Sequence, residues 1–484
     1  MMLALLACAA PDDDEKPDAD ADTDSDTDTD TDSDADSDTD SDPGGCAADR
    51  WDPATFATVI EVGPGTGVET PGDVPWESLG AGTLVRISTA GSPYAAKWAI
   101  DAAGTEDAPI VVIGVCDPDT GELPVIDGRD AVTREALDYW NEDRGIVKIG
   151  GTSTGEGVVP AWVYVEDLEI RGARGAFTDE AGEAATYADN AAAFYVEEGE
   201  HVTVRGCTLA DSGNGIFASS DTSDLTVSSN HVYDNGNPGS AYEHNNYTEA
   251  LGIIFEYNWF GPPCDGCDGN NLKDRSAGTV IRYNRIEGGN RQIDLVESDH
   301  DALVDDPSYR VTYVYGNVLV EPEDDGNSQI LHYGGDGGDT SRYRRGTLFF
   351  YHNTVVSERA GNTTLARLSD VDEVLDARNN VLYAAGTLGV LSTDGSATLA
   401  CNWLPTGWRS AIEGDLPVTD EGGNVTGDDP GFADGYALAD GSAAIDAGGD
   451  LADGAPPAER QYVHPQGGEP RVDEGAADMG AFGR

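Results

Sequence analysis

The chain has 484 residues and carries 91 Asp and Glu against 27 Lys and Arg, which gives a formal net charge of −64 at neutral pH. Nucleic acids and anionic lipid surfaces are polyanions that such a field repels, so neither is expected as a general partner. A chain of this length ordinarily predicts about three domains, whereas a solenoid of stacked repeats can use the same length as one body.

Residues 1–8 are mostly apolar and end in Leu-Leu-Ala-Cys at Cys8. This ending resembles the lipobox that bacterial lipoprotein signal peptidase recognises, which implies that Cys8 is lipidated and that the protein is exported. No Lys or Arg precedes the run, and the run is short for a signal sequence, which a start assigned too late in the gene would explain. Ala9 follows Cys8, and the resemblance therefore implies sorting to the outer membrane or cell surface. The alternative is a free thiol on a cytosolic protein.

Residues 9–45 are a tether rich in Asp that alternates largely with Thr and Ser. Such a segment has almost no apolar surface to bury and its charges repel one another, so an extended, disordered chain is predicted. It would hold the folded part of the protein away from an anchoring lipid. Its carboxylates could bind Ca²⁺ loosely without forming a site.

Six cysteines remain once one of the seven is lipidated, and an exported protein can form disulfides. Cys264 and Cys267 lie in a loop rich in turn residues, where a short-range disulfide is expected. Zinc is less expected there, because no second Cys pair or His pair accompanies this one. Cys46 and Cys116 could staple the N-terminal end of the fold.

The dominant signal is a repeat of short strands, each closing on a turn that contains Asn. These Asn recur at intervals of 26 to 36 residues, at Asn230, Asn258, Asn284, Asn317, Asn353 and Asn380. The segments lack helical periodicity and are interrupted every few residues by Gly, Asn or Asp. Stacked coils of a β-helix explain the pattern. Asn tolerates a positive φ, and its amide can bond along a stack, so we expect these Asn in a line on one side.

These features resemble exported bacterial right-handed parallel β-helix repeat proteins with a pectin-lyase-like fold. The carrying segments include residues 74–79, 108–114, 124–128, 269–276, 442–448 and 478–482. The resemblance implies an all-β chain whose residues 46–410 form a single-stranded right-handed parallel β-helix with an N-terminal cap. Residues 411–484 would be a C-terminal closing segment, and a monomer is expected. The motifs are specific for the fold and weak for the reaction.

A candidate site follows from strand alternation across Gly269–Ser276, which puts Asn271, Lys273 and Arg275 on one face and Leu272 on the other. The preceding coil is offset by 26 residues, judged from Asn258 and Asn284. That coil and the following one add these neighbours: Asn245, Tyr247, Glu249, Gln292 and Asp294. Three adjacent coils are thus predicted to present one polar patch.

The same region concentrates positive charge. Five basic residues fall within 19 positions: Lys273, Arg275, Arg282, Arg285 and Arg291. In a strongly acidic chain this is the local exception that an anionic ligand requires, so the expected partner is an acidic polysaccharide. The alternative is a ladder of ion pairs that only stitches coils together, such as Arg275 with Glu249.

Within the fold, the region is similar to β-helix lyases that cleave alginate or dermatan, which carry Lys-Ser-x-x-Asn-x-Ile-x-x-Asn and an Arg one coil later. Arg275 takes the Lys position and Val296 the later Arg position, so that catalytic pair is not preserved. The acidic pair that binds Ca²⁺ in those lyases would fall on Asp268 and Asn270. At most half of that site remains, and the candidate metal ligands are Asp268 and Glu249.

β-Elimination requires a group that neutralises the uronate carboxylate, a base for the C5 proton and an acid for the leaving oxygen. Arg275 is predicted to be the first. Lys273, crowded by Arg275 and therefore lowered in pKa, is predicted to be the base, with Tyr247 or His244 as the proton donor. The predicted substrate-binding residues are Asn245, Asn271, Arg291, Gln292, Asp294 and His332.

Two other function classes stay open. A glycoside hydrolase needs two carboxylates on either side of the scissile bond, for which Glu249 and Asp294 are the nearest candidates. A non-catalytic surface glycan binder or adhesin would use the basic patch for binding alone.

Overall fold

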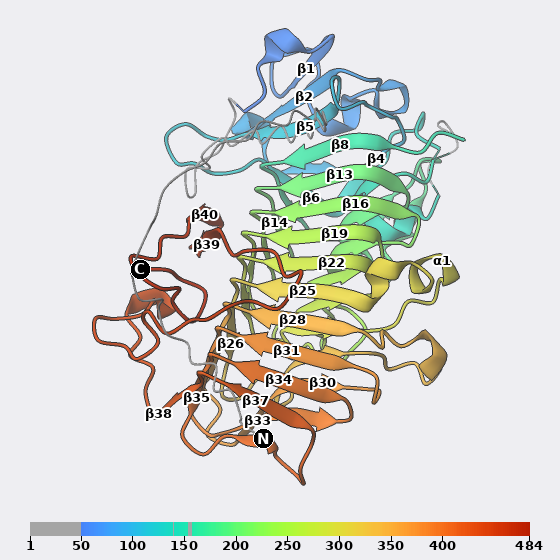
Figure 1. Ribbon diagram of the computed structural model, residues 1–484. Helices are drawn as coiled ribbons and strands as arrows, with labels where there is room; N and C mark the ends of the chain where they lie inside the picture. Colours follow the sequence, from blue (N-terminus) through green and yellow to red (C-terminus); the bar gives the residue numbers. More distant parts are fainter. Residues whose placement is uncertain (1–49, 139, 153–156) are drawn as a thin grey trace, which may run out of the picture.

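The computed structural model describes residues 50–138, 140–152 and 157–484. The predicted lipidation residue Cys8, the predicted tether at residues 9–45 and Cys46 lie outside the described residues. Figure 1 shows the described part as a tall stack of β coils. Its one α-helix, α1 (Asp301–Val304), is a single turn, and no described helix is long and apolar enough to cross a membrane.

Successive coils visit three parallel sheets in the same order, here called sheets A, B and C. Sheet A has 13 strands, namely β1 (Thr58–Val62), β2 (Thr83–Ser88), β5 (Ile110–Val115), β8 (Ala161–Glu166), β13 (Gly199–Arg205), β16 (Thr222–Ser228), β19 (Leu251–Glu256), β22 (Ala277–Arg282), β25 (Val311–Tyr315), β28 (Thr347–Tyr351), β31 (Val374–Arg378), β34 (Ser396–Ala400) and β37 (Val418–Gly422).

Sheet B has 14 strands. Those on its main path are β11 (Ala184–Thr186), β10 (Ala176–Thr178), β6 (Val125–Val132), β9 (Glu169–Arg171), β14 (Thr208–Ala210), β17 (His231–Tyr233), β20 (Trp259–Phe260), β23 (Arg285–Glu287), β26 (Val318–Glu321), β29 (Thr354–Ser357), β32 (Val381–Ala384), β35 (Trp403–Pro405) and β38 (Val425–Gly427). The remaining strand, β3 (Tyr94–Ala96), pairs with β6 off this path. All its pairs are parallel except that of β10 with β11.

Sheet C has 11 strands, namely β4 (Trp98–Ile100), β7 (Gly145–Ile149), β12 (Ala192–Val196), β15 (Asn214–Ala218), β18 (Asn246–Thr248), β21 (Leu272–Asp274), β24 (Ile293–Leu295), β27 (Gln329–Tyr333), β30 (Asn362–Leu368), β33 (Thr387–Thr393) and β36 (Arg409–Ala411). The connections between sheets include short 3₁₀ turns, which are η1 (Pro53–Thr55), η2 (Pro71–Asp73), η3 (Trp76–Ser78), η4 (Thr89–Gly91), η5 (Glu142–Arg144), η6 (Pro307–Arg310), η7 (Thr340–Arg342) and η8 (Asp434–Tyr436).

The core is the interior of the coil, because strand alternation turns every second side chain inward. Leu272, Ile293 and Leu331 occupy matching inward positions on β21, β24 and β27, and each is fully buried. A single coil cannot bury its apolar side chains alone, so stability comes from stacking. The chain is therefore a right-handed parallel β-helix, as the sequence predicts.

The predicted line of Asn is confirmed. Each Asn side chain donates its Nδ2–H to the Oδ1 of the next one over N···O distances of 2.8 to 3.1 Å, in the order Asn230, Asn258, Asn284, Asn317, Asn353, Asn380, Asn402 and Asn424. The ladder runs along the corner between sheets A and B. Each Oδ1 also accepts the backbone N–H of the preceding Asn, as Asn284 does from Asn258 at 3.0 Å.

One predicted reason for Asn at this corner is wrong. The residue with positive φ is the one before each Asn, such as Tyr257 at 56°, Tyr283 at 55° and His352 at 50°. That residue turns the corner and leaves the Asn amide aligned with the stack. Asn is therefore required for its paired donor and acceptor and not for backbone tolerance.

The coils continue through β38, which lies within the segment 411–484 predicted as a C-terminal coil and closing segment. The chain then returns along the outside of the stack, forms the antiparallel hairpin β39 (Arg460–Val463) and β40 (Gly467–Pro470), and continues to Arg484 (Figure 1). Along the way Tyr351 donates its hydroxyl to the carbonyl of Pro456 at 2.8 Å. The returning segment thus covers a column of tyrosines on the A/B corner.

The cysteines agree in part with expectation. The Cys264–Cys267 disulfide is confirmed. Cys116 and Cys401 are also disulfide-bonded, whereas Cys207 is a buried free thiol. Because Cys46 lies outside the described residues, its pairing with Cys116 stays a prediction.

Asn284→Ala should lower the unfolding midpoint in denaturant. The change leaves the carbonyl of Phe255 and the backbone N–H of Asn258 without their buried partner, at about 1 to 3 kcal/mol for each unsatisfied group. Asn424→Ala is the matched control, because this Asn ends the ladder, is partly exposed and can be replaced by water. Equal losses for both variants would contradict a cooperative ladder.

Candidate functional site

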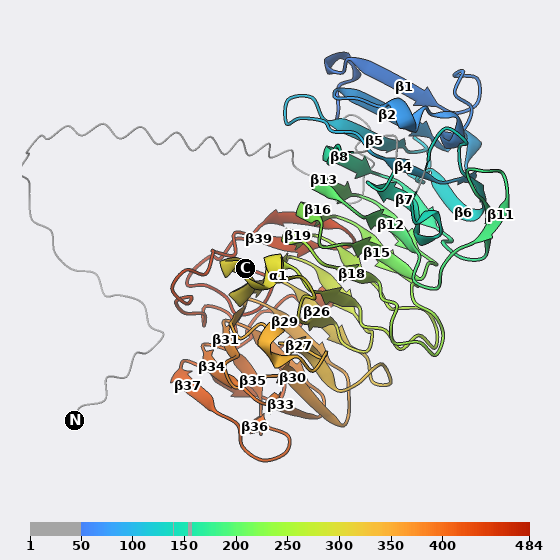
Figure 2. The same ribbon diagram turned by 90° about the vertical axis from the view of Figure 1, so that its right-hand side faces the viewer.

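One column of outward side chains runs along sheet C, and we call it the sheet C row. Figure 2 shows the strands of sheet C, among them β7, β12, β15 and β18, following one another along the stack. The row consists of the residues in register on nine of these strands, which are Lys148, Tyr195, Phe217, Tyr247, Lys273, Asp294, His332, Arg367 and Ser392. Neighbouring strands are about 4.8 Å apart, so consecutive members of the row lie within contact distance.

The 26-residue offset inferred from the repeat is confirmed at the centre of this row. Tyr247 pairs with Lys273, and Lys273 pairs with Asp294 on the next coil. Their strand neighbours Leu272 and Leu295 point into the core and are fully buried. The row members therefore point away from the core, as predicted.

The first half of the row is aromatic. The rings of Tyr195 and Phe217 meet edge to face with centroids 5.1 Å apart, and those of Phe217 and Tyr247 do so at 5.3 Å. The guanidinium of Arg144 lies 5.1 Å from the centroid of Phe217. Tyr195 is buried, whereas Phe217 and Tyr247 are partly exposed, so these two rings beside a cation offer an apolar surface with a local positive charge.

The second half of the row is charged and centred on Asp294. Its Oδ2 accepts a hydrogen bond from Asn270 Nδ2 at 2.7 Å and lies 3.2 Å from Lys273 Nζ. Its Oδ1 lies 2.8 Å from His332 Nδ1. Burial alone raises the pKa of Asp294, but the hydrogen bond from His332 and the charge of Lys273 outweigh burial and hold the pKa well below its usual range. Asp294 is therefore an ionised, fully engaged carboxylate.

Lys273 does not have the lowered pKa that the base hypothesis requires. Burial alone would lower the pKa of Lys273, but the carboxylates of Asp294 and Asp336, each 3.2 Å from Nζ, raise it above its ordinary value. Arg275, predicted to depress it, is a smaller influence. The two carboxylates therefore favour the charged form of Lys273, which argues against its predicted role as base.

Tyr247 lies between two cations. Its ring centroid is 5.8 Å from Lys273 Nζ and 5.7 Å from Arg275 Cζ. Arg275 in turn donates to the carbonyl of Glu297 at 2.7 Å and lies 3.3 Å from Asp299. The predicted ion pair of Arg275 with Glu249 is not formed.

His244 is buried behind Tyr247, with ring centroids 5.4 Å apart. Its Nδ1 accepts the backbone N–H of Asn270 at 2.9 Å. Burial, reinforced by the charge of Lys273, lowers the pKa of His244 to about 3. The imidazole is therefore neutral at physiological pH and supports the ring of Tyr247, instead of donating a proton to substrate as proposed from the sequence.

Three predicted substrate-binding residues lie in the corner between sheets B and C and not on the outward face. Asn245 donates to Asn271 Oδ1 at 3.0 Å, and Asn271 donates to the carbonyl of Glu287 at 2.8 Å. Gln292 donates to Glu321 at 2.6 Å. All three amides are fully buried. Residues that precede a strand turn inward at the corner, so strand alternation does not extend to them.

The predicted basic patch is divided among the three sheets. Arg282 pairs with Glu256 on sheet A at 2.7 Å, and Arg285 pairs with Glu287 on sheet B. These two arginines therefore fit the alternative interpretation, in which the basic residues form structural ion pairs and do not bind a ligand. Arg291 stays beside the site, 3.8 Å from Asp294 and bonded to Gln329.

The candidate metal ligands Asp268 and Glu249 do not fit a Ca²⁺ site. Asp268 is exposed on the disulfide loop, and Glu249 accepts hydrogen bonds from the hydroxyl of Ser298 and the backbone of Asp299. Among residues 50–138, 140–152 and 157–484, no three His, Cys, Asp or Glu side chains gather as metal ligands. Ca²⁺ takes six to eight oxygen ligands, which this pair does not approach.

Ser369 and Arg367 also lie at the site, although they were not among the residues predicted from the sequence. Ser369 follows β30 directly, and its Oγ lies 2.7 Å from His332 Nε2. Arg367 pairs in register with His332, and its buried Nε has no hydrogen-bond partner among the described residues. The signal was available: His332 lies 38 residues after Asp294, and Ser369 lies 37 after His332, which are two more steps of the repeat.

A buried polar cluster holds the strand that carries Lys273 and Arg275. Asp274, between them, points inward and accepts hydrogen bonds from Thr248 at 2.8 Å, Ser276 at 2.6 Å and Thr279 at 2.7 Å. The fully buried Arg344 donates to the carbonyls of Asp274 and Ser276 and lies 3.6 Å from the Asp274 carboxylate. The two Arg344 hydrogen bonds hold the backbone, and the three hydroxyl hydrogen bonds hold the Asp274 side chain, so the strand that carries the two outward cations is rigid.

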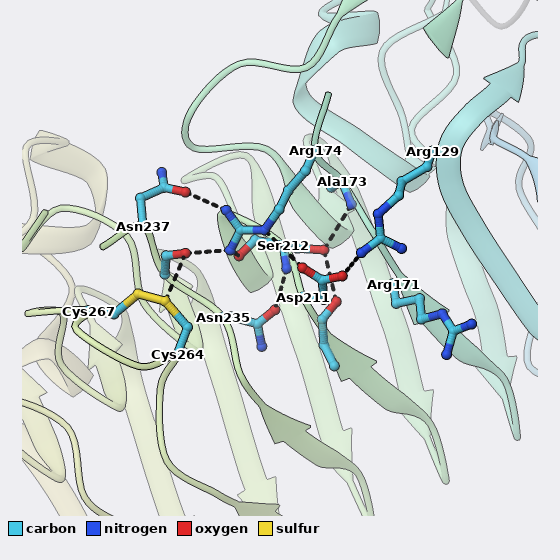
Figure 3. A network of polar contacts seen from close by, with 12 residues as sticks. Arg129, Arg171, Ala173, Arg174, Asp211, Ser212, Asn235, Asn237, Cys264 and Cys267 are labelled. Carbon is cyan, nitrogen blue, oxygen red and sulfur yellow. Dashed lines mark hydrogen bonds and ion pairs between the residues drawn. A yellow bond between two sulfur atoms is a disulfide. The ribbon is translucent and has the colours of Figure 1, made fainter. Parts of the chain in front are cut away.

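A second network anchors the loop that leads to Asn270 (Figure 3). Arg174 bonds to Asp211 at 3.1 Å and to Asn237 at 2.5 Å, and it also donates to the carbonyl of Gly236. Cys264 Sγ lies 3.5 Å from that same carbonyl, so the disulfide loop packs on this network. The loop ends at Asn270, which holds Asp294.

The site does not coincide with a deep cavity. A cavity of about 540 Å³ lies where the returning C-terminal segment meets sheet B, and it is lined by residues that include Arg285, Tyr436 and His464. None of the sheet C row lines it. The chemistry of the row is therefore suited to a long ligand laid along a surface and not to a small enclosed one.

Comparison with known proteins agrees with the fold. Residues 182–306 match the family described as right handed beta helix region. Among solved structures, alginate lyase from Paenibacillus sp. str. FPU-7 is 13% identical with a TM-score of 0.44, covering 70% of this chain and 99% of that one. Pectate lyase Pel9A is 13% identical with a TM-score of 0.44, covering 89% and 97%. DFA-IIIase from Arthrobacter chlorophenolicus A6, solved without its lid, is 11% identical with a TM-score of 0.33, covering 70% and 71%.

No curated protein sequence matches the chain. At such low identities the structural likenesses concern the fold alone. The protein is thus a right-handed parallel β-helix protein with a charged and aromatic row on one sheet, and its activity must be argued from that row.

The neutral, buried state of His244 makes folding stability depend on pH. Its folded pKa of about 3 lies below its ordinary value of 6.5, so below pH 6.5 the unfolded chain binds a proton that the folded chain does not. Stability falls with pH in that window by about 1.4 kcal/mol per unit. In His244→Gln this contribution is absent, while the amide can still accept from Asn270.

The difference in free energy of unfolding between wild type and His244→Gln should therefore shrink by about 1.5 to 2 kcal/mol from pH 6.5 to 5, measured by denaturant unfolding. The other titrating groups contribute equally to both proteins, so their pH dependence cancels in this difference. Parallel pH profiles would show that His244 is protonated in the folded protein.

Proposed function

We propose that this protein binds an acidic polysaccharide along the sheet C row and cleaves it by β-elimination at Tyr247. The observation that carries the proposal is the position of Tyr247, an outward phenol between the cations Lys273 and Arg275, at the junction of the aromatic and charged halves of the row. This revises the roles drawn from the sequence: Lys273 joins Arg275 as a carboxylate clamp, and Tyr247 transfers the proton.

Binding follows from the composition of the row. The partly exposed rings of Phe217 and Tyr247 can stack on the apolar faces of sugar rings. Lys273, Arg275 and Arg291 lie close together on a chain of net charge −64, and the carboxylates of Asp294, Asp299 and Asp336 pair with them. A uronate carboxylate can replace the exposed Asp299 and Asp336 as their partner, which favours a uronate-containing glycan over a neutral one.

The chemistry requires that negative charge on the uronate be neutralised as the C5 proton leaves. Lys273 and Arg275 supply two fixed cations for the carboxylate, and this preorganised charge stabilises the enolate-like transition state. Tyr247 takes the C5 proton on its hydroxyl oxygen and gives its own proton to the glycosidic oxygen, as the bond from C4 to that oxygen breaks. A C4–C5 double bond remains on one product.

The paired-carboxylate alternative is less favoured by the geometry. Asp294 is buried, with only 1% of its side chain exposed, and is held by Asn270, His332 and Lys273. Its strongly lowered pKa is the opposite of what a general acid requires. Glu249 is engaged with Ser298 and not aimed at a shared substrate position.

We propose further that the protein is exported and held at the outer membrane or cell surface by a lipid on Cys8. The support is the lipobox-like ending at Cys8 and the acidic tether that follows it. A polysaccharide-active protein would meet its polymer there.

Tyr247→Phe should lower kcat for β-elimination by roughly 10² to 10⁴-fold while leaving glycan binding nearly unchanged, because the ring stays and only the proton-transfer group is lost. Turnover is measured as ultraviolet absorbance of the unsaturated product over a panel of alginate, pectate, glycosaminoglycan and neutral glycans. Arg275→Ala should weaken binding roughly ten- to a hundredfold, since a charge-assisted contact is worth about 1.5 to 3 kcal/mol.

Tyr242→Phe is the matched control, because Tyr242 is 81% exposed on a loop and outside the row. Equal activity of the two Tyr variants would reject Tyr247 as the proton-transfer residue. Binding of an acidic glycan without any unsaturated product would instead support a non-catalytic glycan binder.

Cys8→Ser should move the protein from the membrane fraction to the soluble fraction of cells that express the full gene, since the acyl chains are the proposed anchor. Fractionation followed by immunoblotting measures this. Unchanged fractionation would reject the lipid anchor, and the proposed role of the sheet C row would be unaffected.

A further inference from the structure

Three side chains at the charged end of the row form a continuous hydrogen-bonded chain. His332 Nδ1 lies 2.8 Å from Asp294 Oδ1, and His332 Nε2 lies 2.7 Å from Ser369 Oγ. His332 and Asp294 are each 1% exposed, whereas Ser369 is only partly buried. The two buried members thus lie behind a serine that solvent can reach.

The direction of each hydrogen bond follows from Asp294. Its pKa is held well below the usual range, so the carboxylate is ionised and can only accept. The proton between the pair is therefore on His332 Nδ1. In the neutral imidazole this leaves the Nε2 lone pair as the acceptor for the hydroxyl proton of Ser369. The same division of roles, acid to Nδ1 and hydroxyl to Nε2, is what makes a serine nucleophilic in hydrolases of unrelated fold.

The coil repeat explains why the three residues meet. Asp294 and His332 are in register on β24 and β27, and Ser369 lies just beyond β30 on the third consecutive coil. The backbone N–H groups of Ser369 and Asp370 both donate to the buried carboxylate of Glu373, at 2.6 and 3.0 Å. The serine is thus held by its own turn and does not depend on His332 for its position.

A cation adjoins this chain. Arg367 is the row neighbour of His332, and its buried Nε lacks a hydrogen-bond partner within the described ranges. It also lies close enough to Arg291 for the two charges to repel, since the charge of Arg367 lowers the pKa of Arg291. An under-paired guanidinium in a strongly acidic protein is suited to an oxyanion or carboxylate of a ligand.

We propose that Ser369, His332 and Asp294 form a second reactive centre that hydrolyses carboxylic esters carried by the polysaccharide, with Arg367 stabilising the oxyanion. The identity of the ester carrier rests on the proposed function, because the centre is on the same row as Tyr247. The ester is either an O-acetyl group on a sugar hydroxyl or a methyl ester of a uronate, and both present the same carbonyl to Ser369.

The reaction balances with water as the only co-substrate. Ser369 Oγ bonds to the carbonyl carbon while its proton passes to His332 Nε2, and Asp294 stabilises the imidazolium that forms. The carbon to alkoxy-oxygen bond breaks, and His332 returns the proton to the leaving oxygen. Water then repeats the sequence in place of Ser369, releasing the carboxylic acid and restoring the serine. No oxidant, reductant or metal takes part.

The first test is covalent labelling of the intact protein with a fluorophosphonate, followed by peptide mass mapping. The adduct is expected on Ser369, because only an activated serine reacts quickly. Ser341 is the internal control, since it is exposed, lies outside the sheet C row and donates its hydroxyl to Asp339 and not to an imidazole. An unlabelled Ser369, or equal labelling of Ser369 and Ser341, overturns the proposal without any variant.

The second test measures ester hydrolysis by wild type, Ser369→Ala and Ser341→Ala on acetylated and on methyl-esterified acidic glycans. Ser369→Ala should lose at least about 10³-fold in rate, and Ser341→Ala, which changes an exposed serine outside the sheet C row, should match wild type. Release of acetate identifies an O-acetyl substrate and release of methanol a methyl ester. Full activity of Ser369→Ala on both substrates contradicts the proposal.

The two centres can fail independently. Ser369→Ala should leave the unsaturated product of elimination unchanged on an ester-free glycan, because Ser369 is not part of the Tyr247 chemistry. Tyr247→Phe should in turn leave fluorophosphonate labelling of Ser369 unchanged. Labelling without elimination would retain the ester centre and reject the proposed lyase, and elimination without labelling would do the reverse.

Discussion

The structure depends on one constraint, the in-register hydrogen bonding of each coil to the next. Because every coil repeats the same path through three sheets, a residue on one coil acquires a fixed neighbour about 4.8 Å above and below it. The column from Tyr195 to Arg367 is a direct result. Residues more than a hundred positions apart become a continuous surface without any long-range loop, and chemistry can change along that surface coil by coil.

The corners follow different rules from the faces. At a corner the backbone turns, and polar groups that cannot pair in a sheet must find partners inside the stack. The Asn ladder between sheets A and B meets this need, and Asn245 with Asn271 does the same between sheets B and C. Amides at corners are therefore structural, whereas side chains at the middle of the short sheet C strands point away from the core, where a ligand or a neighbouring side chain can meet them.

The ion pairs that each outward side chain forms determine its protonation state, and the protonation state determines the role that the side chain can have. In a protein with 91 acidic residues, most cations of the row have a carboxylate nearby. Burial favours neutral Lys273, but two adjacent carboxylates favour the cation more strongly, so Lys273 becomes a clamp. The same competition keeps Asp294 ionised, which fixes the tautomer of His332 and turns Ser369 into its donor. Asp294 thus contacts a residue of each proposed centre, Lys273 in one and His332 in the other, but the reacting atoms of the two centres are different.

The sequence by itself determined the fold, the offset between coils and the line of Asn258, Asn284, Asn353 and Asn380, because a repeat that must stack encodes its own period. It also placed Tyr247, Lys273 and Asp294 on adjacent coils. Only the tertiary structure decided that Gln292 is buried in a corner, that Lys273 keeps its proton and that Ser369 meets His332. Burial, pKa and corner geometry depend on neighbours from several coils at once, and one-dimensional spacing does not contain that information.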